Sequence, residues 1–218
     1  AGPVSKGIVS GTTAMLAQAT LTPGAQVHIE AARKAAGTDA KGVFDVTCGY
    51  LTQGPRPSTP AAPRQPGPPA RETWFREPAK VFDNLYFLGQ SEYSSWAVTT
   101  SQGIIIIDAI YDYSVQEEVE GGMKKLGLDP AQIKYVIVSH GHGDHSGGAK
   151  FLQDKYNARV LLTAEDWDLL EKSKDRPNAQ PVPRRDMVVT DGMKLTLGDT
   201  TITMYITPGH TMGTISTL

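Results

Sequence analysis

Short apolar runs alternate with helical repeats of apolar residues along the chain from Val81 onward. The predicted strands are bounded by turn residues and lie at 85–88, 96–100, 103–108, 134–139, 159–163, 187–190, 193–197, 200–207 and 214–218. Helical spacing predicts helices at 114–126, 147–156 and 164–172, the last with Thr163 and Asp166 as a capping box. Strands and helices that alternate beside β-meanders predict an α/β layered domain.

The first part of the chain follows a different pattern. Thr22 as N-cap and Gly37 as stop predict one helix, with Val27, Ala31 and Ala35 along its apolar stripe. This helix has too few large apolar residues to form a core of its own. We therefore treat it as part of an N-terminal extension.

Eight prolines stand between Gly54 and Pro78. Proline lacks the N–H group that helices and sheets require, so this segment is predicted to be an extended linker or an arm lying on another surface. We assign residues 1–80 to the N-terminal extension and residues 81–218 to the folded domain. Because such an arm is ordered only by contact, we expect it to be exchanged between protomers of a homo-oligomer.

Composition and charge exclude several classes of partner. The 218 residues include 21 basic and 23 acidic side chains, which give a net charge of −2 and no field that would attract a polyanion. The longest aliphatic run, 104–107, is far shorter than the roughly 20 residues that span a membrane. We therefore expect a small-molecule partner, with neither nucleic acid nor membrane.

Two features of the first 50 residues bear on location and redox state. A weakly apolar run at 7–16 precedes Ala17-Gln18-Ala19, which has the small-x-small pattern of a signal-peptidase site. We expect a periplasmic or secreted protein, with a cytoplasmic one as the alternative. Cys48 is the one cysteine and cannot form an intrachain disulfide. A half-buried side chain is expected there, and an intermolecular bridge or reactive thiol is the alternative.

The candidate metal-binding residues lie directly after the strand predicted at 134–139. Three imidazoles and one carboxylate stand within six positions: His140, His142, Asp144 and His145. Side chains two apart in an extended loop point the same way, so His140 and His142 can meet one ion while the other two face a neighbouring point. Nitrogen and oxygen donors without a thiolate favour zinc or a similar first-row ion. A surface histidine cluster is the alternative.

Two more strand ends supply candidate groups. His210 stands in a Pro-Gly-His turn after the strand at 200–207, where it can supply a third nitrogen and leave one coordination position open. Asp108 ends an apolar strand and can accept the free N–H of a metal-bound histidine. The alternative for Asp108 is a turn cap. Tyr93, Trp96 and Tyr111 are candidates for an apolar pocket wall, with core packing as the alternative for Trp96.

These motifs resemble the metallo-β-lactamase fold superfamily. The resemblance rests on His-x-His-x-Asp-His at 140–145, Gly-His-Thr at 209–211 and the strand at 103–108, and it extends from Val81 to the last residue. The segments 84–89, 133–140 and 145–148 are most similar to the third subclass of metallo-β-lactamases, which uses only histidine and aspartate ligands. The resemblance implies a four-layered αββα sandwich. It also implies further residues after Leu218, so we expect an incomplete C-terminal half.

The same resemblance implies two zinc ions. It places the first on His140, His142 and His210, and the second on Asp144, His145 and one more histidine. Since the remaining histidine, His28, is badly placed, we expect this polypeptide to be the N-terminal portion of a longer protein. The missing ligand would lie on a separate C-terminal fragment that either stays associated after a nick or is lost.

The resemblance also implies an activity. We expect a zinc-dependent hydrolase that opens a β-lactam or a related amide or ester through a metal-bound hydroxide, with Asp144 orienting that nucleophile. Glyoxalase II-like thioesterases, lactonases, alkylsulfatases and phosphodiesterases share the ligand set and are alternatives. A non-catalytic metal-binding fragment is the alternative from another class. The residues that bind the substrate are not identified.

Overall fold

The structure is a computed structural model that describes residues 21–48, 67–177 and 179–218. The chain divides into two compact units, residues 1–64 and residues 65–218. The signal-like run and most of the proline-rich segment lie outside the described residues, so the arm, the oligomer and the location stay predictions. No helix among the described residues has both the length and the apolar character needed to cross a bilayer.

The described part of the first unit is a pair of helices, α1 (Pro23–Ala36) and α2 (Lys41–Thr47). Thr22 caps α1 by accepting a hydrogen bond from the backbone N–H of Ala25 at 3.2 Å, as the sequence predicts. The predicted apolar stripe is wrong, because Val27 is exposed and Ile29 is buried with Phe44 of α2. The packing of α2, which the pattern does not reveal, decides which face of α1 is buried.

The second unit contains ten strands and several short helices among its described residues. The strands are β1 (Ala79–Lys80), β2 (Leu85–Phe87), β3 (Trp96–Thr100), β4 (Gly103–Ile107), β5 (Ile133–Ile137), β6 (Arg159–Thr163), β7 (Met187–Val189), β8 (Met193–Leu197), β9 (Thr200–Ile206) and β10 (Ile215–Thr217). The helices are α3 (Arg71–Trp74), the π-helical η2 (Gln116–Gly121), α4 (Gly122–Lys125), the 3-10 turn η3 (Pro130–Gln132), α5 (Gly143–Ser146), α6 (Ala149–Tyr156) and α7 (Ala164–Ser173).

This unit begins earlier than the predicted boundary at residue 80. Helix α3, which the sequence analysis missed, is held against the domain by Trp74. The backbone carbonyl of Trp74 accepts a hydrogen bond from Ser91 at 2.9 Å, and its ring lies 5.7 Å from that of Tyr113. A residue buried by partners distant in sequence leaves no local periodicity to detect.

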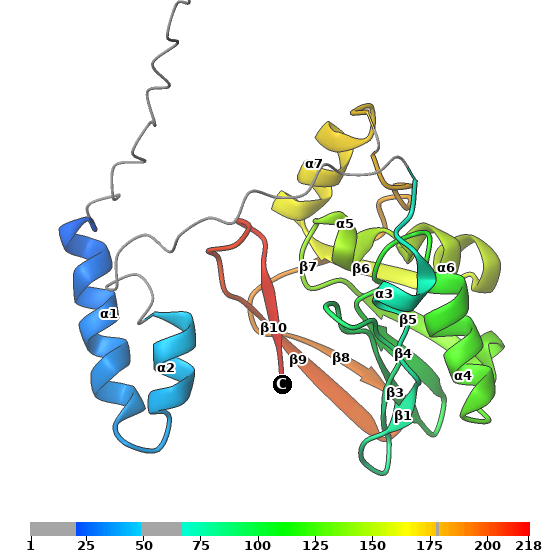
Figure 1. Ribbon diagram of the computed structural model, residues 1–218, viewed down its shortest axis with the longest axis horizontal. Helices are drawn as coiled ribbons and strands as arrows, with labels where there is room; N and C mark the ends of the chain where they lie inside the picture. The colour runs from blue at the N-terminus through cyan, green and yellow to red at the C-terminus, as the bar shows by residue number, and fades with distance from the viewer. Residues whose placement is uncertain (1–20, 49–66, 178) are drawn as a thin grey trace, which may run out of the picture. The chain divides into compact units, whose positions relative to one another are not determined.

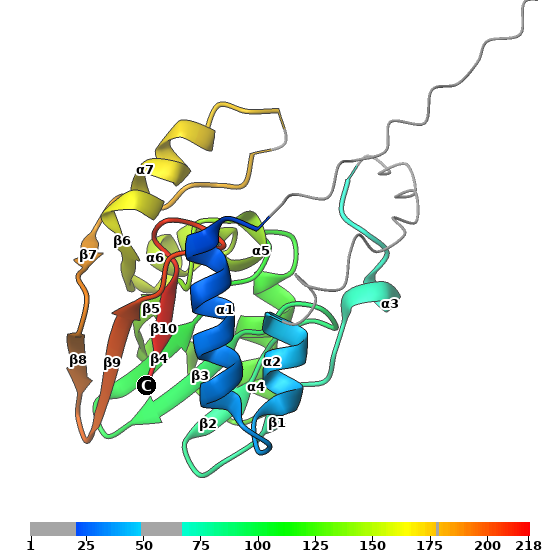
Figure 2. The ribbon, with the colours of Figure 1, turned by 90° about the vertical axis from the view of Figure 1, so that its left-hand side faces the viewer.

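The strands form two sheets. The first has the order β1-β2-β3-β4-β5-β6-β7, antiparallel from β1 to β4 and parallel from β4 to β7. The second is the antiparallel sheet β10-β9-β8. Helices α4 and α6 lie on the opposite side of the first sheet from β8, β9 and β10 (Figure 1). Figure 2, turned by 90°, shows the red and orange strands β10 and β9 in front of the green β3 and β4.

Strand β4 shows how the core is divided between the two faces of the first sheet. Ile104 and Ile106 pack with residues of the helices, whereas Ile105 packs with residues of β8, β9 and β10. All three are buried. The described residues from 67 onward therefore form an α/β arrangement of three layers, namely helices, first sheet and second sheet, in the order that the αββα sandwich implied by the resemblance requires.

The predicted helix at 114–126 is divided. Residues 116–121 form a π-helical turn before α4 begins. The wider turn buries Glu118, Val119 and Glu120 in succession, which an α-helix with one apolar stripe does not do.

Ile105→Ala should lower the free energy of unfolding by about 2–5 kcal/mol, because the side chain is fully buried between the two sheets and its loss leaves a cavity. Urea denaturation followed by circular dichroism measures this. Val188→Ala, on exposed β7 surface, is the control and should change stability by no more than about 0.5 kcal/mol. Equal effects of the two variants would show that the sheets are not packed as described.

Candidate metal centre

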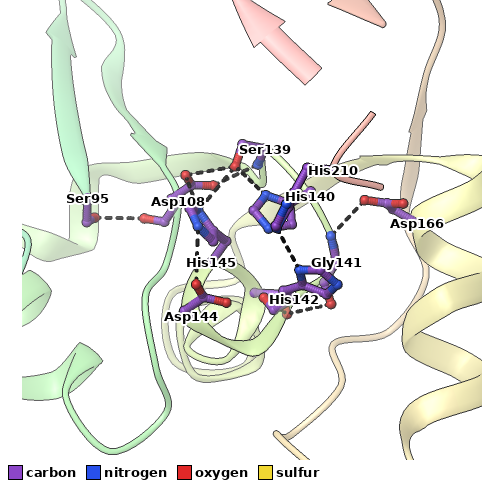
Figure 3. Close-up of polar contacts among 11 residues, drawn as sticks. Ser95, Asp108, Ser139, His140, Gly141, His142, Asp144, His145, Asp166 and His210 are labelled. Carbon is purple, nitrogen blue, oxygen red and sulfur yellow. Dashed lines mark hydrogen bonds and ion pairs between the residues drawn. The ribbon is translucent and has the colours of Figure 1, made fainter. Parts of the chain in front are cut away.

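The candidate site lies at one edge of the first sheet. The carboxyl ends of the parallel strands β4, β5 and β6 meet there, and Asp108, His140 and Asp166 follow these three strands within a few residues. His210 reaches the same place from the loop between β9 and β10 (Figure 3). The structure thus brings the five predicted ligands together with Asp108, because neighbouring parallel strands deliver their ends to the same edge.

Three histidines form a first group. One ligand atom each from His140, His142 and His210 can be chosen so that all lie within 4.8 Å of one another. Nδ1 of His142 lies 2.9 Å from Nε2 of His210, and the ring of His140 stands 4.6 Å from that of His210. His140 is buried while the other two are exposed, so the group opens toward solvent on one side.

The environment of His140 keeps its imidazole neutral. Burial, together with the neighbouring imidazoles of His145, His142 and His210, lowers the pKa of His140 to about 4. Its Nε2 is buried and has no hydrogen-bond partner among the described residues. An unpartnered lone pair that points at other imidazoles is what a metal ligand requires, so the residues present fit a zinc ion.

A second group consists of His140, Asp144 and His145, whose ligand atoms also lie within 4.8 Å of one another. Nε2 of His145 is 3.5 Å from a carboxylate oxygen of Asp144. The resemblance implied a further histidine beside Asp144 and His145; among the described residues, the third member of this group is His140. The two groups therefore share one residue and lie side by side.

Asp108 forms a hydrogen bond with His145 of the second group and holds the loop before it. Its Oδ2 accepts a hydrogen bond from Nδ1 of His145 at 2.7 Å and from the hydroxyl of Ser139 at 2.9 Å, and its Oδ1 accepts from the backbone N–H of Ser139 at 2.7 Å. The residue is buried and has a φ of 61°, in the left-handed region that aspartate tolerates. Its backbone carbonyl accepts a bond from Ser95 at 2.7 Å.

This contact changes the protonation of His145. Burial alone favours the neutral imidazole, but the hydrogen bond and charge of Asp108, with the charge of Asp144, raise the pKa of His145 above its ordinary value. Since Nδ1 faces Asp108, Nε2 is the nitrogen left for a metal. Asp108 therefore fixes which nitrogen of His145 faces Asp144.

Asp166 is a site residue that the sequence analysis took for a helix cap. The predicted capping box is wrong, because Thr163 makes no side-chain cap for α7. Its hydroxyl instead donates to the carbonyl of Gly213 at 3.0 Å, and Asp166 accepts from the backbone N–H of Gly141 at 2.7 Å. These partners lie in the two loops that carry the histidines. The one local signal is an aspartate just after a strand end.

Gln180 was also missed. Its side-chain oxygen accepts a hydrogen bond from the backbone N–H of Asp112 at 3.1 Å. The same side chain fills the space beside Gly143, where a Cβ atom would overlap it, and beside Gly147. Both glycines therefore allow the segment that carries Gln180 to approach residues 140–147, which hold four of the candidate ligands. The sequence around Gln180 contains no pattern that predicts this contact.

Comparisons with known proteins identify the family of this chain. Residues 88–217 match the model of the metallo-beta-lactamase superfamily. A hydroxyacylglutathione hydrolase of Acidiphilium cryptum is 31% identical over 87 residues, which is 40% of this chain and 31% of that protein. A UPF0173 metal-dependent hydrolase of Staphylococcus carnosus is 33% identical over 60 residues, which is 28% of this chain and 26% of that protein. The chain thus spans about a third or less of these relatives.

Solved structures give longer matches. A subclass B3 metallo-beta-lactamase of Bradyrhizobium japonicum has a TM-score of 0.62 and 33% identity over 66% of this chain and 57% of its own. A metallo-beta-lactamase of Cronobacter sakazakii has a TM-score of 0.60 and 30% identity over 65% and 57%. The family model covers more than half of the 218 residues, including every member of both ligand groups. The chain belongs to the metallo-beta-lactamase superfamily.

Proposed function

We propose that this chain carries the metal centre of a zinc-dependent hydrolase that opens a β-lactam ring. The observation that supports this most directly is the pair of adjacent ligand groups sharing His140, built from imidazole and carboxylate donors without a thiolate. The structural likeness to subclass B3 metallo-beta-lactamases favours a β-lactam over other acyl substrates. Zinc would be held by His140, His142 and His210, with Asp144 and His145 available to a second ion.

The protein residues around the centre have separate tasks. When bound, zinc supplies Lewis acidity and lowers the pKa of a coordinated water to about 7. His140 offers a neutral imidazole without first losing a proton, because its pKa is about 4. Asp144 is half-exposed next to His145, so its carboxylate can accept a hydrogen bond from a water and orient it.

An aromatic surface begins beside this carboxylate. The rings of Tyr93 and Tyr111 meet edge to face at 5.2 Å, and Tyr111 stacks on Tyr113 at 5.1 Å. Burial, the hydrogen bond to Tyr93 and the nearby charge of Asp144 all raise the pKa of Tyr111, so its phenol stays neutral. These half-buried rings are the candidate wall against which the apolar part of a substrate would lie.

Thioester hydrolysis is the second candidate. It is favoured by the hydroxyacylglutathione hydrolases among the relatives. The ligand set serves both reactions equally well, since each begins with attack on a carbonyl carbon. The substrate assay therefore has to decide between them.

A substrate panel tests the proposal. The zinc-loaded 218-residue chain is mixed with nitrocefin, S-lactoylglutathione, an acyl-homoserine lactone, an alkyl sulfate and bis-p-nitrophenyl phosphate, and we expect turnover of nitrocefin. Turnover of S-lactoylglutathione alone would show that the substrate is a thioester and not a β-lactam. Turnover of only one of the other three compounds would assign the substrate to the class of that compound. A chain that binds zinc but turns over none of them would be a non-catalytic metal-binding module.

Asp144→Ala should reduce turnover by about 100-fold or more, which corresponds to roughly 2.7–4 kcal/mol, because it removes a ligand oxygen next to the reacting water. Circular dichroism should show an unchanged fold, since Asp144 contributes nothing to either core. Asp154→Ala, on the surface of α6, is the matched control and should keep full activity. Wild-type turnover of zinc-loaded D144A would rule out this role for the carboxylate.

Asp108→Asn should lower the pKa of His145 in the metal-free protein, because the charge that raises it is removed. The raised pKa of His145 stabilises the fold at pH values below the ordinary pKa of about 6.5, and this contribution disappears as the pH rises through the folded-state value. The variant should therefore destabilise the protein more at pH 5 than at pH 8.5.

NMR titration of the imidazole and urea denaturation at the two pH values measure both effects. The affinity for zinc should also fall, by about 10–100-fold, because His145 loses its orienting partner. Asparagine tolerates the left-handed backbone at this position, so the fold should be kept. An unchanged pKa of His145 together with unchanged zinc binding would make Asp108 a turn cap only.

A further inference from the structure

We infer that Asp166 is a positioning residue that sets the distance between His142 and His210 and thereby assembles the first ligand group. The inference rests on the proposed zinc site, and it assigns to that site a residue outside the histidine motif.

The carboxylate of Asp166 joins the two ligand loops. Oδ2 accepts from the backbone N–H of Gly141 at 2.7 Å and from the hydroxyl of Thr211 at 2.8 Å. Oδ1 accepts from the backbone N–H of Gly213 at 3.2 Å. Gly141 lies between His140 and His142, and Thr211 directly follows His210. One side chain on α7 thus connects the loop that follows β5 with the loop between β9 and β10 (Figure 3 shows the contact with Gly141).

Both loops approach the start of α7 closely, each at a glycine, and at Gly213 a larger residue would not fit without a shift of its neighbours. A Cβ atom at Gly213 would overlap the Thr163 hydroxyl and lie 2.7 Å from Oδ1 of Asp166. A Cβ atom at Gly141 would lie 3.1 Å from the backbone carbonyl of Asp166 and crowd Leu169. The glycines therefore bring the backbones of the two loops within reach of the one carboxylate.

The ligands depend on this connection because they have little packing of their own. His142 and His210 are exposed, whereas Asp166 is 1% exposed. An exposed side chain keeps its place only if the backbone that carries it is fixed. The backbone on the C-terminal side of His210 is fixed by Asp166 and by a hydrogen bond that the backbone N–H of Thr211 donates to the hydroxyl of Thr214 at 3.0 Å.

A carboxylate is required because every partner is a donor. Burying a charged group is costly unless its hydrogen bonds are made, and here three donors from two loops satisfy it. Asparagine at this position would present an amide N–H₂ to at least one backbone N–H, so one donor would lose its acceptor. The two loops would then separate on that side, and His142 and His210 would lose their fixed spacing.

The test compares Asp166→Asn with two control variants on the same helix. Asp168→Asn removes an exposed carboxylate that pairs with Arg185, and Leu170→Ala removes a buried side chain from the helix-side core. Zinc affinity of each full-length folded variant is measured by competition with a chromophoric chelator, well below the thermal transition. Hydrogen exchange of the Gly141 and Gly213 amides is measured in the metal-free proteins.

We expect D166N to bind zinc about 10–100-fold more weakly and to exchange both glycine amides faster than wild type. D168N should change neither quantity. L170A should lower the thermal midpoint while keeping zinc affinity, which separates positioning from general destabilisation. Wild-type zinc affinity in D166N, or an equal loss of affinity in L170A, would overturn the inference.

Thr211→Val gives a second, milder variant, because it removes a single donor to Asp166. If D166N does not fold, T211V decides the matter: a severalfold loss of zinc affinity supports the inference, and an unchanged affinity overturns it. Failure of the wild-type chain to bind zinc would instead contradict the proposed function. If wild type binds zinc and D166N binds it with the same affinity, only the role of Asp166 would be contradicted.

Discussion

The burial of β4, β5 and β6 on both faces is the constraint on which the rest of the structure depends. Ile105, Ile137 and Leu161 pack toward the second sheet, and their sequence neighbours pack toward the helices. A slip of one residue in any of these strands would exchange the two sets and bury the wrong side chains. The registers Ile107 with Ile137 and Ile137 with Leu161 are therefore fixed, and with them the positions of the three strand ends.

Two buried carboxylates, which follow the ends of β4 and β6, connect this packed core to the polar site. Asp108 and Asp166 are 6% and 1% exposed, and each accepts three hydrogen bonds from neighbouring loops. An unpaired buried carboxylate would destabilise the fold, so each one holds its donors in place. The ligands His142 and His210 are exposed to an incoming ion and substrate, while the two carboxylates that support the site are buried.

The sequence predicts those features that depend on near neighbours in the chain. Apolar runs and alternation place β3, β6 and β8 at their observed bounds. Strand β6 is buried after its first residue, β3 is buried or half-buried throughout, and β8 alternates between exposed and buried residues. The histidine cluster is visible because four of its members stand within six residues. Strand-end chemistry further points to Asp108 and His210, whose places in the fold depend only on where a strand stops.

What the sequence does not reveal depends on partners far along the chain. Thr163 and Asp166 have the pattern of a helix cap, but their hydrogen-bond partners lie elsewhere. Thr163 bonds to Gly213, 50 residues away, and Asp166 bonds to Gly141 and Thr211 in the two loops that carry the histidines. Trp74 and Gln180 likewise find their partners only in the folded domain. Local pattern assigns such side chains to the nearest available role, and tertiary contacts then override it.

His140 and His145 differ in how readily they bind a proton, although their ring centroids lie 4.1 Å apart. Burial lowers the pKa of His140, whose Nε2 lacks a partner, whereas Asp108 raises the pKa of His145. Two imidazolium ions at this distance would repel each other, so the proton, when present, belongs to His145. The first group thus keeps a lone pair ready at neutral pH, and the buried carboxylate of Asp108 makes this division.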